Sequence, residues 1–278
     1  MIWRTSRRAF DLGSNGVIMG ILNVTPDSFS DGGAHASSGT AVEHGLRMAG
    51  EGAGIIDVGG ESTRPGSAPV TVEEELRRVV PVIEQLAARV PAAISIDTSK
   101  AAVARAAVAA GAEIINDITA LRGDPAMAGV VAESGAALVL MHMQGTPRTM
   151  QQDPCYADAL REVADFLHGR IEAARAAGIA ADRLAVDPGI GFGKTAEHNL
   201  QLIAGLGVIA ALGYPVLLGV SRKSFLAATG CEDMADRDAA TTALTTLGRN
   251  CGACIFRVHA VRPNIRALRV AEAVLAAR

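Results

Sequence analysis

Polar or charged side chains stand at the end of each of a series of short apolar runs along the chain. All of them considered as site candidates are Asp, Asn, His, Lys or Arg, the residue types that bind nitrogen-rich rings and phosphates. They are Asn23, Asp57, Asp97, Asn116, His142, Asp187, Lys223, Arg257 and His259. Any one of them alone is explained as a helix cap or a turn residue. Brought together in one place, unpaired polar groups would be costly without a ligand, so the set predicts a binding site.

These residues fall into two chemical groups. Asp97, Asn116 and Asp187 offer oxygen acceptors for an N–H and an adjacent amino group, as on the edge of an uncharged, nitrogen-rich heterocycle. The second group offers positive charge to an anion such as a phosphate and consists of Lys223, Arg257 and His259. The sequence therefore predicts a site with acceptors for a ring on one side and cations for an anion on the other.

The apolar runs recur eight times, with helical stretches between them. Each is rich in Val, Ile and Leu and apolar on both faces, which is typical of a parallel strand covered by helices. The runs cover residues 17–24, 53–60, 92–99, 112–118, 137–143, 183–189, 215–221 and 253–259. Eight strand–helix units in about 250 residues predict an α/β fold, the (β/α)₈ TIM barrel. We expect residues 1–278 to form a single domain with a short N-terminal extension at 1–15.

An open, doubly wound sheet is the competing fold. Such a sheet usually carries a glycine-rich dinucleotide turn after its first strand, whereas the first run here is followed by NVTPDSF. A barrel also places functional groups at the carboxyl ends of its strands, where the polar residues stand. Helix signals agree: Thr71 lies three residues before Glu74, as in a capping box. Glycines that end predicted helices are Gly111, Gly135 and Gly178.

Two motifs resemble known sites but fail by spacing. The stretch PGIGFGKT at 188–195 looks like a phosphate loop, but Pro188 stands where that motif requires glycine. We interpret its glycines as a flexible loop that presents Phe192. Cys251 and Cys254 form a CxxC without a second pair or a thioredoxin-like context. The six His form no closely spaced zinc pair.

Composition narrows the class of protein. The chain has 278 residues, 49% of them hydrophobic, and a net charge of −3, which favours neither a nucleic-acid nor a membrane partner. The N-terminus lacks the apolar segment of a secretory signal, and no run of about 18 apolar residues exists. Four cysteines in a chain of this length do not make a disulfide framework. We expect a cytoplasmic protein whose partners are small molecules.

Several longer motifs occur in a recognisable order. They are GILNVTPDSFSDGG, IIDVGGESTRPG, ISIDTSK, IINDI, LMHMQGTPRTMQ, AVDPGIGFGKT, GVSRKSF and FRVH. Together they resemble the motifs of bacterial dihydropteroate synthase over nearly the whole chain. The resemblance implies a (β/α)₈ barrel that condenses 6-hydroxymethyl-7,8-dihydropterin diphosphate with p-aminobenzoate and releases pyrophosphate. It also implies Mg²⁺ as cofactor, a homodimer, and inhibition by sulfonamides, which mimic p-aminobenzoate.

The resemblance also implies roles for single residues. Asn23 matches the magnesium and diphosphate ligand of the family. Substrate contacts are matched by Thr63, Arg64, Asp97, Asn116, Asp187, Lys223, Arg257 and His259. The wall of the p-aminobenzoate pocket is matched by Phe29, Pro65, Phe192, Lys223 and Ser224, and Met141 is a candidate for the face of the pterin. The expected catalytic residues are Asp97, Lys223, Arg257 and His259.

The loop NVTPDSFSDGG is long for a connector and carries a lone aromatic residue. We hypothesise that it is a lid, with Asn23 at the rim and Phe29 covering the amine substrate. GESTRPGSAPV would be a second mobile loop. One departure from the family concerns the residue after RVH, which is often acidic and is Ala260 here. The orientation of His259 is therefore in question.

Two alternatives to the synthase remain open. The methyltetrahydrofolate-binding domain of a corrinoid methyltransferase would share the pterin carboxylates but would not need a diphosphate site. A pterin-binding paralogue without synthase activity would share every matched ligand. The NVTPDSF, SRKS and RVH motifs favour the synthase over the methyltransferase. Only turnover separates the synthase from the inactive paralogue.

Overall fold

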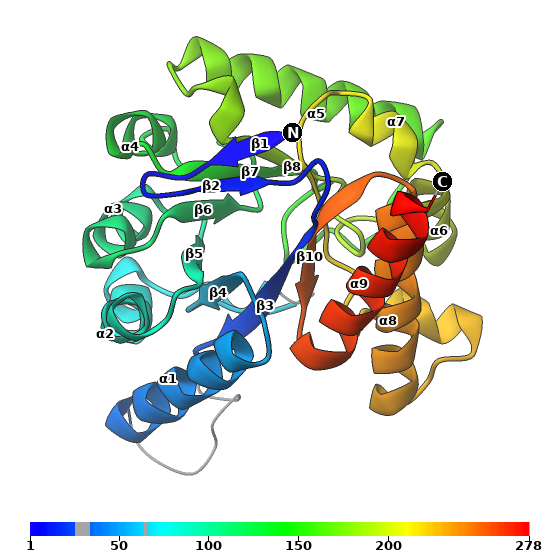
Figure 1. Ribbon diagram of the computed structural model, residues 1–278. Coiled ribbons are helices and arrows are strands. Elements are labelled where there is room, and N and C mark those ends of the chain that lie inside the picture. The colour runs from blue at the N-terminus through cyan, green and yellow to red at the C-terminus, as the bar shows by residue number, and fades with distance from the viewer. Residues whose placement is uncertain (26–33, 64–65, 278) are drawn as a thin grey trace.

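Eight parallel strands close into a barrel at the centre of the molecule (Figure 1). The computed structural model describes residues 1–25, 34–63 and 66–277. The strands are β3 (Val17–Asn23), β4 (Ile55–Gly59), β5 (Ala93–Asp97), β6 (Ile114–Asp117), β7 (Ala137–Met141), β8 (Leu184–Asp187), β9 (Val216–Leu218) and β10 (Ala253–Val258). They follow one another in chain order, and β10 pairs with β3 to close the ring. The predicted (β/α)₈ barrel is confirmed, and every strand lies within one predicted apolar run.

Helices surround the barrel (Figure 1). They are α1 (Ala34–Gly50), α2 (Val72–Arg89), α3 (Ala101–Ala110), α4 (Met127–Ser134), α5 (Ala159–Ala176), α6 (Ala196–Ala204), α7 (Leu206–Ala210), α8 (Met234–Asn250) and α9 (Val261–Ala276), with short 3₁₀ turns η2 (Ala181–Arg183) and η3 (Ser224–Thr229). Helix α2 buries Val79, Val82, Ile83 and Leu86, whose spacing places one apolar stripe against the strands. Within the described part of the chain, no helix has the length and apolarity needed to cross a membrane.

The predicted helix ends are largely present. The side chain of Thr71 accepts a hydrogen bond from the backbone N–H of Glu74 at 3.3 Å, which begins α2. The reciprocal half of the capping box is not formed, because the Glu74 carboxylate pairs with Arg77 and Arg78 instead. Three glycines with φ of 120°, 68° and 89° follow helices as predicted: Gly111, Gly135 and Gly178.

Side chains of the barrel strands alternate between two layers, because successive residues of a strand face opposite sides. On β4, Ile56 and Val58 pack outward in the same cluster as the helices, whereas Ile55 packs inward. The inward apolar cluster is a floor at the start of the strands, formed with Met19, Ile55, Ala93, Ile114, Val139, Ala185, Leu217 and Ile255. Two residues further along, the inward positions include Asp57 and Arg257. The barrel therefore has an apolar floor and a polar mouth.

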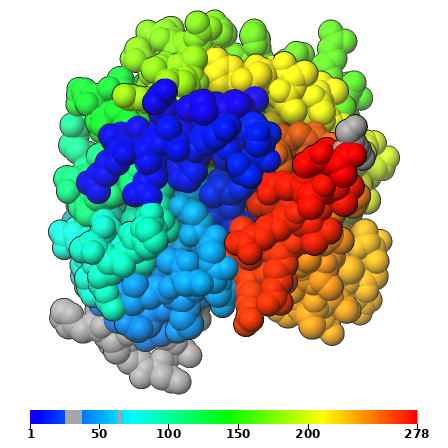
Figure 2. Space-filling view, in the orientation of Figure 1, coloured from blue at the N-terminus to red at the C-terminus, as the bar shows by residue number. Residues whose placement is uncertain are grey.

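The N-terminal extension forms an antiparallel hairpin, β1 (Ile2–Arg4) and β2 (Ala9–Asp11), that sequence patterning did not predict. Trp3 is fully buried in the floor, its ring centroid lies 5.9 Å from that of Phe10, and its Nε1 donates to the Arg183 carbonyl at 3.1 Å. In Figure 2 the blue atoms of this segment lie across the middle of the face, between the surrounding helices. The hairpin therefore closes the end of the barrel opposite the mouth.

Glu113, directly before β6, ties the hairpin to the barrel. Its carboxylate is 2% exposed, accepts from the Thr5 hydroxyl at 2.7 Å, and pairs with the Arg8 guanidinium at 2.6 Å. A buried carboxylate is tolerated only when charge and hydrogen bonds compensate it, and the hairpin supplies both. Both carboxylate oxygens of Glu113 therefore have protein partners, and this end of the barrel serves the stability of the fold.

We expect Trp3→Ala to lower the free energy of unfolding by about 3–5 kcal/mol, because it leaves a cavity in the barrel floor. Turnover below the melting transition should stay near that of the wild type, since Trp3 lies opposite the polar mouth. Denaturant titration measures the first effect and steady-state kinetics the second. The control is Ile2→Ala on the same strand, a residue that is 44% exposed and should cost little. Equal stability of the Trp3 variant and the control would contradict the assigned role of the floor.

Candidate active site

The strand register aligns several predicted site residues along one edge of the mouth. Asn23 is paired with Gly59, Gly59 with Asp97, and Asp97 with Asn116 across three neighbouring strand pairs. A Cβ on Gly59 would lie 3.6 Å from the Cβ of Asp97 and 3.7 Å from Oδ1 of Asn23. Glycine at this position therefore lets the amide of Asn23 and the carboxylate of Asp97 border the same space.

Arg257 joins two carboxylates in the mouth. Its Nε donates to Oδ2 of Asp57 at 2.6 Å, and its Nη2 donates to Oδ2 of Asp97 at 2.7 Å. Asn116 also donates to Oδ2 of Asp57, at 3.2 Å. Asp57 is fully buried, so this guanidinium is its compensating charge. The sequence places Asp57 among the polar strand ends but predicts no individual role for it in binding or catalysis.

The same cluster leaves acceptor atoms unsatisfied. Among the described residues, the buried Oδ1 atoms of Asp57, Asp97 and Asn116 have no hydrogen-bond partner. Leaving a buried acceptor unpaired costs about 1–3 kcal/mol, more for a charged group. Three such atoms at one rim point to a ligand rich in N–H donors.

Burial shifts the protonation of these groups. Desolvation raises the pKa of Asp97 to about 7, with the neighbouring Asp57 adding to the effect and Arg257 opposing it. Arg257 has its pKa raised by the two carboxylates despite its own burial, so it remains charged. The mouth therefore holds a permanently positive guanidinium beside a carboxylate that titrates near neutrality.

Asp187, at the end of β8, faces a second cation. Its Oδ1 accepts from the backbone N–H of Gly189 at 2.6 Å, and burial raises its pKa while Lys223 and Arg257 lower it. The Lys223 ammonium lies 4.2 Å from the ring centroid of Phe192 and binds the carbonyl of Ile190. Burial lowers the pKa of Lys223 to about 7, an effect that Asp187 opposes. The structure therefore places Asp187, Lys223 and Phe192 close together.

The loop after β8 is not the flexible connector that its glycines suggested. Gly189, Gly191 and Gly193 have φ of 66°, 81° and 63°. A Cβ on Gly189 would lie 1.8 Å from the carbonyl oxygen of His142, and one on Gly193 would lie 2.6 Å from that of Gln144. The glycines are therefore required for close packing of this loop against the segment after β7.

Ser221 orients His259. The Ser221 Oγ accepts from the backbone N–H of His259 at 3.1 Å and lies 2.9 Å from its Nδ1. A hydroxyl can donate to one group and accept from two others, so Ser221 holds the ring through Nδ1 in either imidazole tautomer. The missing acidic side chain at Ala260 therefore does not leave the His259 ring without an orienting partner.

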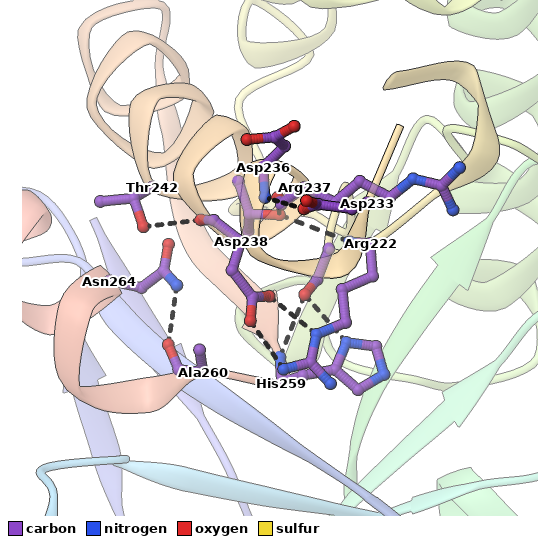
Figure 3. A network of polar contacts seen from close by, with 11 residues as sticks. Arg222, Asp233, Asp236, Arg237, Asp238, Thr242, His259, Ala260 and Asn264 are labelled. Atoms are coloured by element: carbon purple, nitrogen blue, oxygen red, sulfur yellow. Dashed lines mark hydrogen bonds and ion pairs between the residues drawn. The ribbon is translucent and has the colours of Figure 1, made fainter. Parts of the chain in front are cut away.

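An ion pair holds the chain between Ser221 and Lys223. Arg222 has φ of 58° and donates to Asp238 on α8 from Nε and Nη2 at 2.7 and 2.8 Å. Figure 3 shows Arg222 reaching Asp238 beside the imidazole of His259. A left-handed residue other than glycine is uncommon, and this bidentate pair compensates for its strain. The left-handed backbone at Arg222 turns the chain so that Ser221 contacts His259 and Lys223 contacts the loop after β8.

A cleft of about 270 Å³ opens beside Asp97 and is lined by Thr63, Thr98, Ile118 and Thr146 among others. Met141 is 2% exposed and packs with Ile118, Met143, Met150 and Phe192 in a small apolar cluster. Ser224 is exposed at the first position of η3, next to Lys223. Thr63, Met141 and Ser224 therefore all lie at or beside the mouth.

Three predicted site residues, Phe29, Arg64 and Pro65, lie outside the described residues, as does most of the loop proposed to be a lid. Within residues 1–25, 34–63 and 66–277, no three His, Cys, Asp or Glu side chains gather in a group that could hold a metal ion. The donors at this rim are oxygens, with the Asn23 amide beside Asp97. That set suits a hard cation that takes its remaining ligands from water and substrate phosphates.

Known proteins are closely similar to this chain. A family model described as "Pterin binding enzyme" matches residues 19–259. Dihydropteroate synthase from Escherichia coli (strain K12) is 48% identical over 261 residues, which are 94% of this chain and 92% of that protein. The structure of Xanthomonas albilineans dihydropteroate synthase with 4-aminobenzoic acid has a TM-score of 0.92 at 49% identity and covers 99% and 98% of the two chains. Yersinia pestis dihydropteroate synthase in a sulfonamide drug complex has a TM-score of 0.93 at 44% identity and covers 100% of both chains.

The matched region runs from β3 to the residue after β10 and so includes every predicted site residue from Asn23 to His259. The three relatives are synthases, in agreement with the motifs that favoured a synthase over a methyltransferase. The chain therefore belongs to the pterin-binding enzymes and, within them, to the dihydropteroate synthases, transferases of folate biosynthesis that join a dihydropterin diphosphate to p-aminobenzoate.

Proposed function

We propose that the mouth of the barrel condenses 6-hydroxymethyl-7,8-dihydropterin diphosphate with p-aminobenzoate through the residues described above. The observation that carries this assignment is the cluster of unpaired, buried acceptors on Asp57, Asp97 and Asn116 around the Arg257 guanidinium. A pterin ring presents N–H and NH₂ donors along one edge, which would satisfy such acceptors. The alternative of an inactive paralogue shares this cluster and differs in turnover.

The pterin is held by Asp97, Asn116 and Asp187, which accept hydrogen bonds from its ring nitrogens, and by Lys223, which donates to a ring oxygen. Met141 lies against the ring face from the apolar cluster at the end of β7. Because each of these side chains is fixed by packing or by a second hydrogen bond, the ring binds in one register. Thr63 contacts the substrate from the cleft beside Asp97.

The diphosphate binds on the cationic side, between Asn23, Arg257 and His259. Nε2 of His259 donates to a phosphate oxygen, while Ser221 holds the ring through Nδ1. Mg²⁺ would be held by the Asn23 oxygen together with substrate phosphates and water, and would stabilise negative charge on the leaving oxygens. This assignment is supported by the position of Asn23 beside Asp97.

The reaction needs no nucleophilic side chain. The bond from the pterin methylene carbon to the diphosphate oxygen breaks first, so the ring system carries positive charge and pyrophosphate leaves with the electron pair. The ionised Asp97 stabilises that charge, while Arg257 and His259 stabilise the leaving group. The amine of p-aminobenzoate then forms the C–N bond and loses one proton.

The amine pocket is built from Phe192, Lys223 and Ser224, with Phe29, Arg64 and Pro65 contributed by loops outside the described residues. Ser224 is exposed and placed to receive the benzoate carboxylate. Sulfonamides compete for the same pocket, a proposal supported by the sulfonamide complex of the Yersinia relative. We therefore expect p-aminobenzoate to relieve sulfonamide inhibition.

We propose a homodimer formed through α8 and α9. These helices pack together and expose Leu247, Val270 and Val274 at 55%, 61% and 57% of their surfaces. Large exposed apolar side chains on adjacent helices are typical of protein contacts. The proposed cytoplasmic location is supported by the four cysteines, all of which are free.

Turnover with dihydropterin diphosphate and p-aminobenzoate, with and without Mg²⁺, tests the proposed function directly. We expect dihydropteroate to form only when the metal is present, because the leaving diphosphate requires compensating charge. Product formation is followed chromatographically. Absence of product with both substrates and Mg²⁺ present, while pterin still binds, would instead identify the inactive paralogue.

We expect Asp97→Asn to lower kcat by a factor of hundreds, because one preorganised electrostatic group is worth about 2.7–4 kcal/mol in the barrier. The amide keeps the shape of the side chain, removes its charge and replaces one acceptor oxygen with an NH₂ donor. Arg257→Lys should also lower kcat, since an ammonium cannot bridge two carboxylates as a guanidinium does.

Arg257→Ala does not test the catalytic role of Arg257 cleanly. It leaves the buried Asp57 carboxylate without a cation, which costs about 3–5 kcal/mol in stability, so a loss of turnover could come from unfolding. The matched control is Arg105→Gln on α3, whose exposed ion pair with Glu133 lies outside the mouth.

Wild-type kcat in Asp97→Asn, at equal stability, would refute the role of Asp97.

The pH dependence of kcat/KM should reflect the titration of Lys223. Its pKa is lowered to about 7, so it loses its proton as the pH rises above that value. We expect kcat/KM for the dihydropterin substrate to fall at alkaline pH, because the free enzyme must carry the charged form. Lys223→Arg keeps its charge and should remove this fall. Since profile shapes are compared, a lower absolute rate in the variant does not affect the test, and persistence of the alkaline fall would contradict the assignment.

A further inference from the structure

Lys194 is a buried lysine to which neither the sequence nor the proposed reaction assigns a role, and burial lowers its pKa to about 7 while Asp187 opposes that shift. It is 3% exposed, and its Nζ makes three contacts of 2.9 Å each, to the carbonyl oxygens of Gly189 and Phe192 and to Nδ1 of His142. In its protonated form the amine has three donors and no acceptor, so each of these contacts uses one donor. The three acceptors come from two different loops of the barrel mouth.

His142, which directly follows β7, is suited to accept a hydrogen bond from Lys194. Burial, with the charge of Lys194 adding to it, lowers the pKa of His142 to about 3, so its ring is neutral at physiological pH. A neutral imidazole that accepts at Nδ1 carries its proton on Nε2. The His142 ring also packs edge-on against Phe166 with centroids 4.8 Å apart, which holds it in place. Lys194 therefore binds a fixed acceptor on one loop and two carbonyls on the other.

The glycines of the loop after β8 explain why carbonyls converge on this ammonium. Left-handed residues at Gly189, Gly191 and Gly193 alternate along the loop and turn its carbonyl groups inward. A phosphate loop uses similar glycines to turn N–H groups toward an anion. Here the polarity is reversed: Lys194 binds the carbonyls of Gly189 and Phe192, and Lys223 binds that of Ile190.

Both of the carbonyls held by Lys194 belong to residues that shape a substrate site. The N–H of Gly189 binds Oδ1 of Asp187, the pterin carboxylate, while its carbonyl is bound by Lys194. The ring of Phe192 faces Lys223 in the amine pocket, while its carbonyl is bound by Lys194. One ammonium thus restrains the backbone on either side of the loop segment that separates the two sites.

We propose that Lys194 is a positioning residue that fixes Asp187 for the pterin and Phe192 for p-aminobenzoate at the same time. It touches neither substrate and acts only through the loop between residues 189 and 194. This inference rests on the substrate roles given to Asp187 and Phe192 in the proposed function. It also accounts for the buried lysine at the end of a motif that fails as a phosphate loop.

Steady-state kinetics of Lys194→Met test the proposal. Methionine is unbranched like lysine and reaches the ε position, but it lacks the amine and all of its donors. We expect the KM values for both substrates to rise by about tenfold or more, since small displacements of positioning groups cost up to about 100-fold in rate. Asp187→Asn should chiefly raise the KM for the pterin, and Phe192→Ala chiefly that for p-aminobenzoate, so the joint rise is the signature of Lys194.

A matched control comes from a residue that binds the same loop from outside it. The Tyr156 hydroxyl donates to the carbonyl of Gly193 at 2.7 Å and does not hold Gly189 or Phe192. Tyr156→Phe also removes a hydrogen bond to this loop, and we expect both KM values to stay near those of the wild type. If Lys194→Met does not fold, Lys194→Gln keeps two donors on a shorter side chain and should raise both KM values less.

The outcomes are distinguishable. A merely structural role would reduce the folded fraction, and with it the apparent kcat, while both KM values stayed at wild-type levels; that result would overturn the inference. A rise in only one KM would overturn the claim that Lys194 serves both sites. Absence of turnover in the wild type itself would refute the proposed function rather than the role of Lys194.

Discussion

The mouth of this barrel depends on one guanidinium that compensates two buried carboxylates. Asp57 is fully buried and Asp97 nearly so, and Arg257 contacts both at hydrogen-bond distance. Without that charge, both carboxylates would be buried with no cation to compensate them. With it, each carboxylate still has one oxygen unpaired. Arg257 therefore compensates the buried charges, while the unpaired oxygens remain as acceptors for a ring rich in N–H donors. The neighbouring side chains are arranged around this cluster.

Stability and function occupy opposite ends of the barrel. At the floor, the N-terminal hairpin buries Trp3 and supplies Thr5 and Arg8 to the carboxylate of Glu113. At the mouth, buried acceptors are left for a ligand. The alternation of strand side chains produces both regions from the same strands, since inward positions are apolar at the start of a strand and polar at its end. A well-packed floor offsets the cost of an unsatisfied mouth.

The glycines of the loop after β8 have a different role from the one that the sequence motif suggested. Its glycines suggested mobility, yet their left-handed conformations allow contacts with the His142 and Gln144 carbonyls that a side chain would prevent. The carbonyls of the loop face two lysines, so the backbone serves as a cradle for cations. Both lysines lie close to Asp187, which links the electrostatics of the pterin carboxylate to the packing of the amine pocket.

The sequence by itself determined the barrel and most of the mouth. Strands buried on both faces must be apolar throughout, so eight such runs were visible, and the polar residue after each run, such as Asp97 or Asp187, marked the mouth. Only the tertiary structure decided which polar groups meet: Arg257 and Asp57 are 200 residues apart, and their pairing exists because the last strand closes on the first. The hairpin was missed because its strands of three residues carry too little periodicity to be recognised. The contacts of Lys194 with His142 and of Ser221 with His259 join loops that neighbouring strands bring together, which no local pattern encodes.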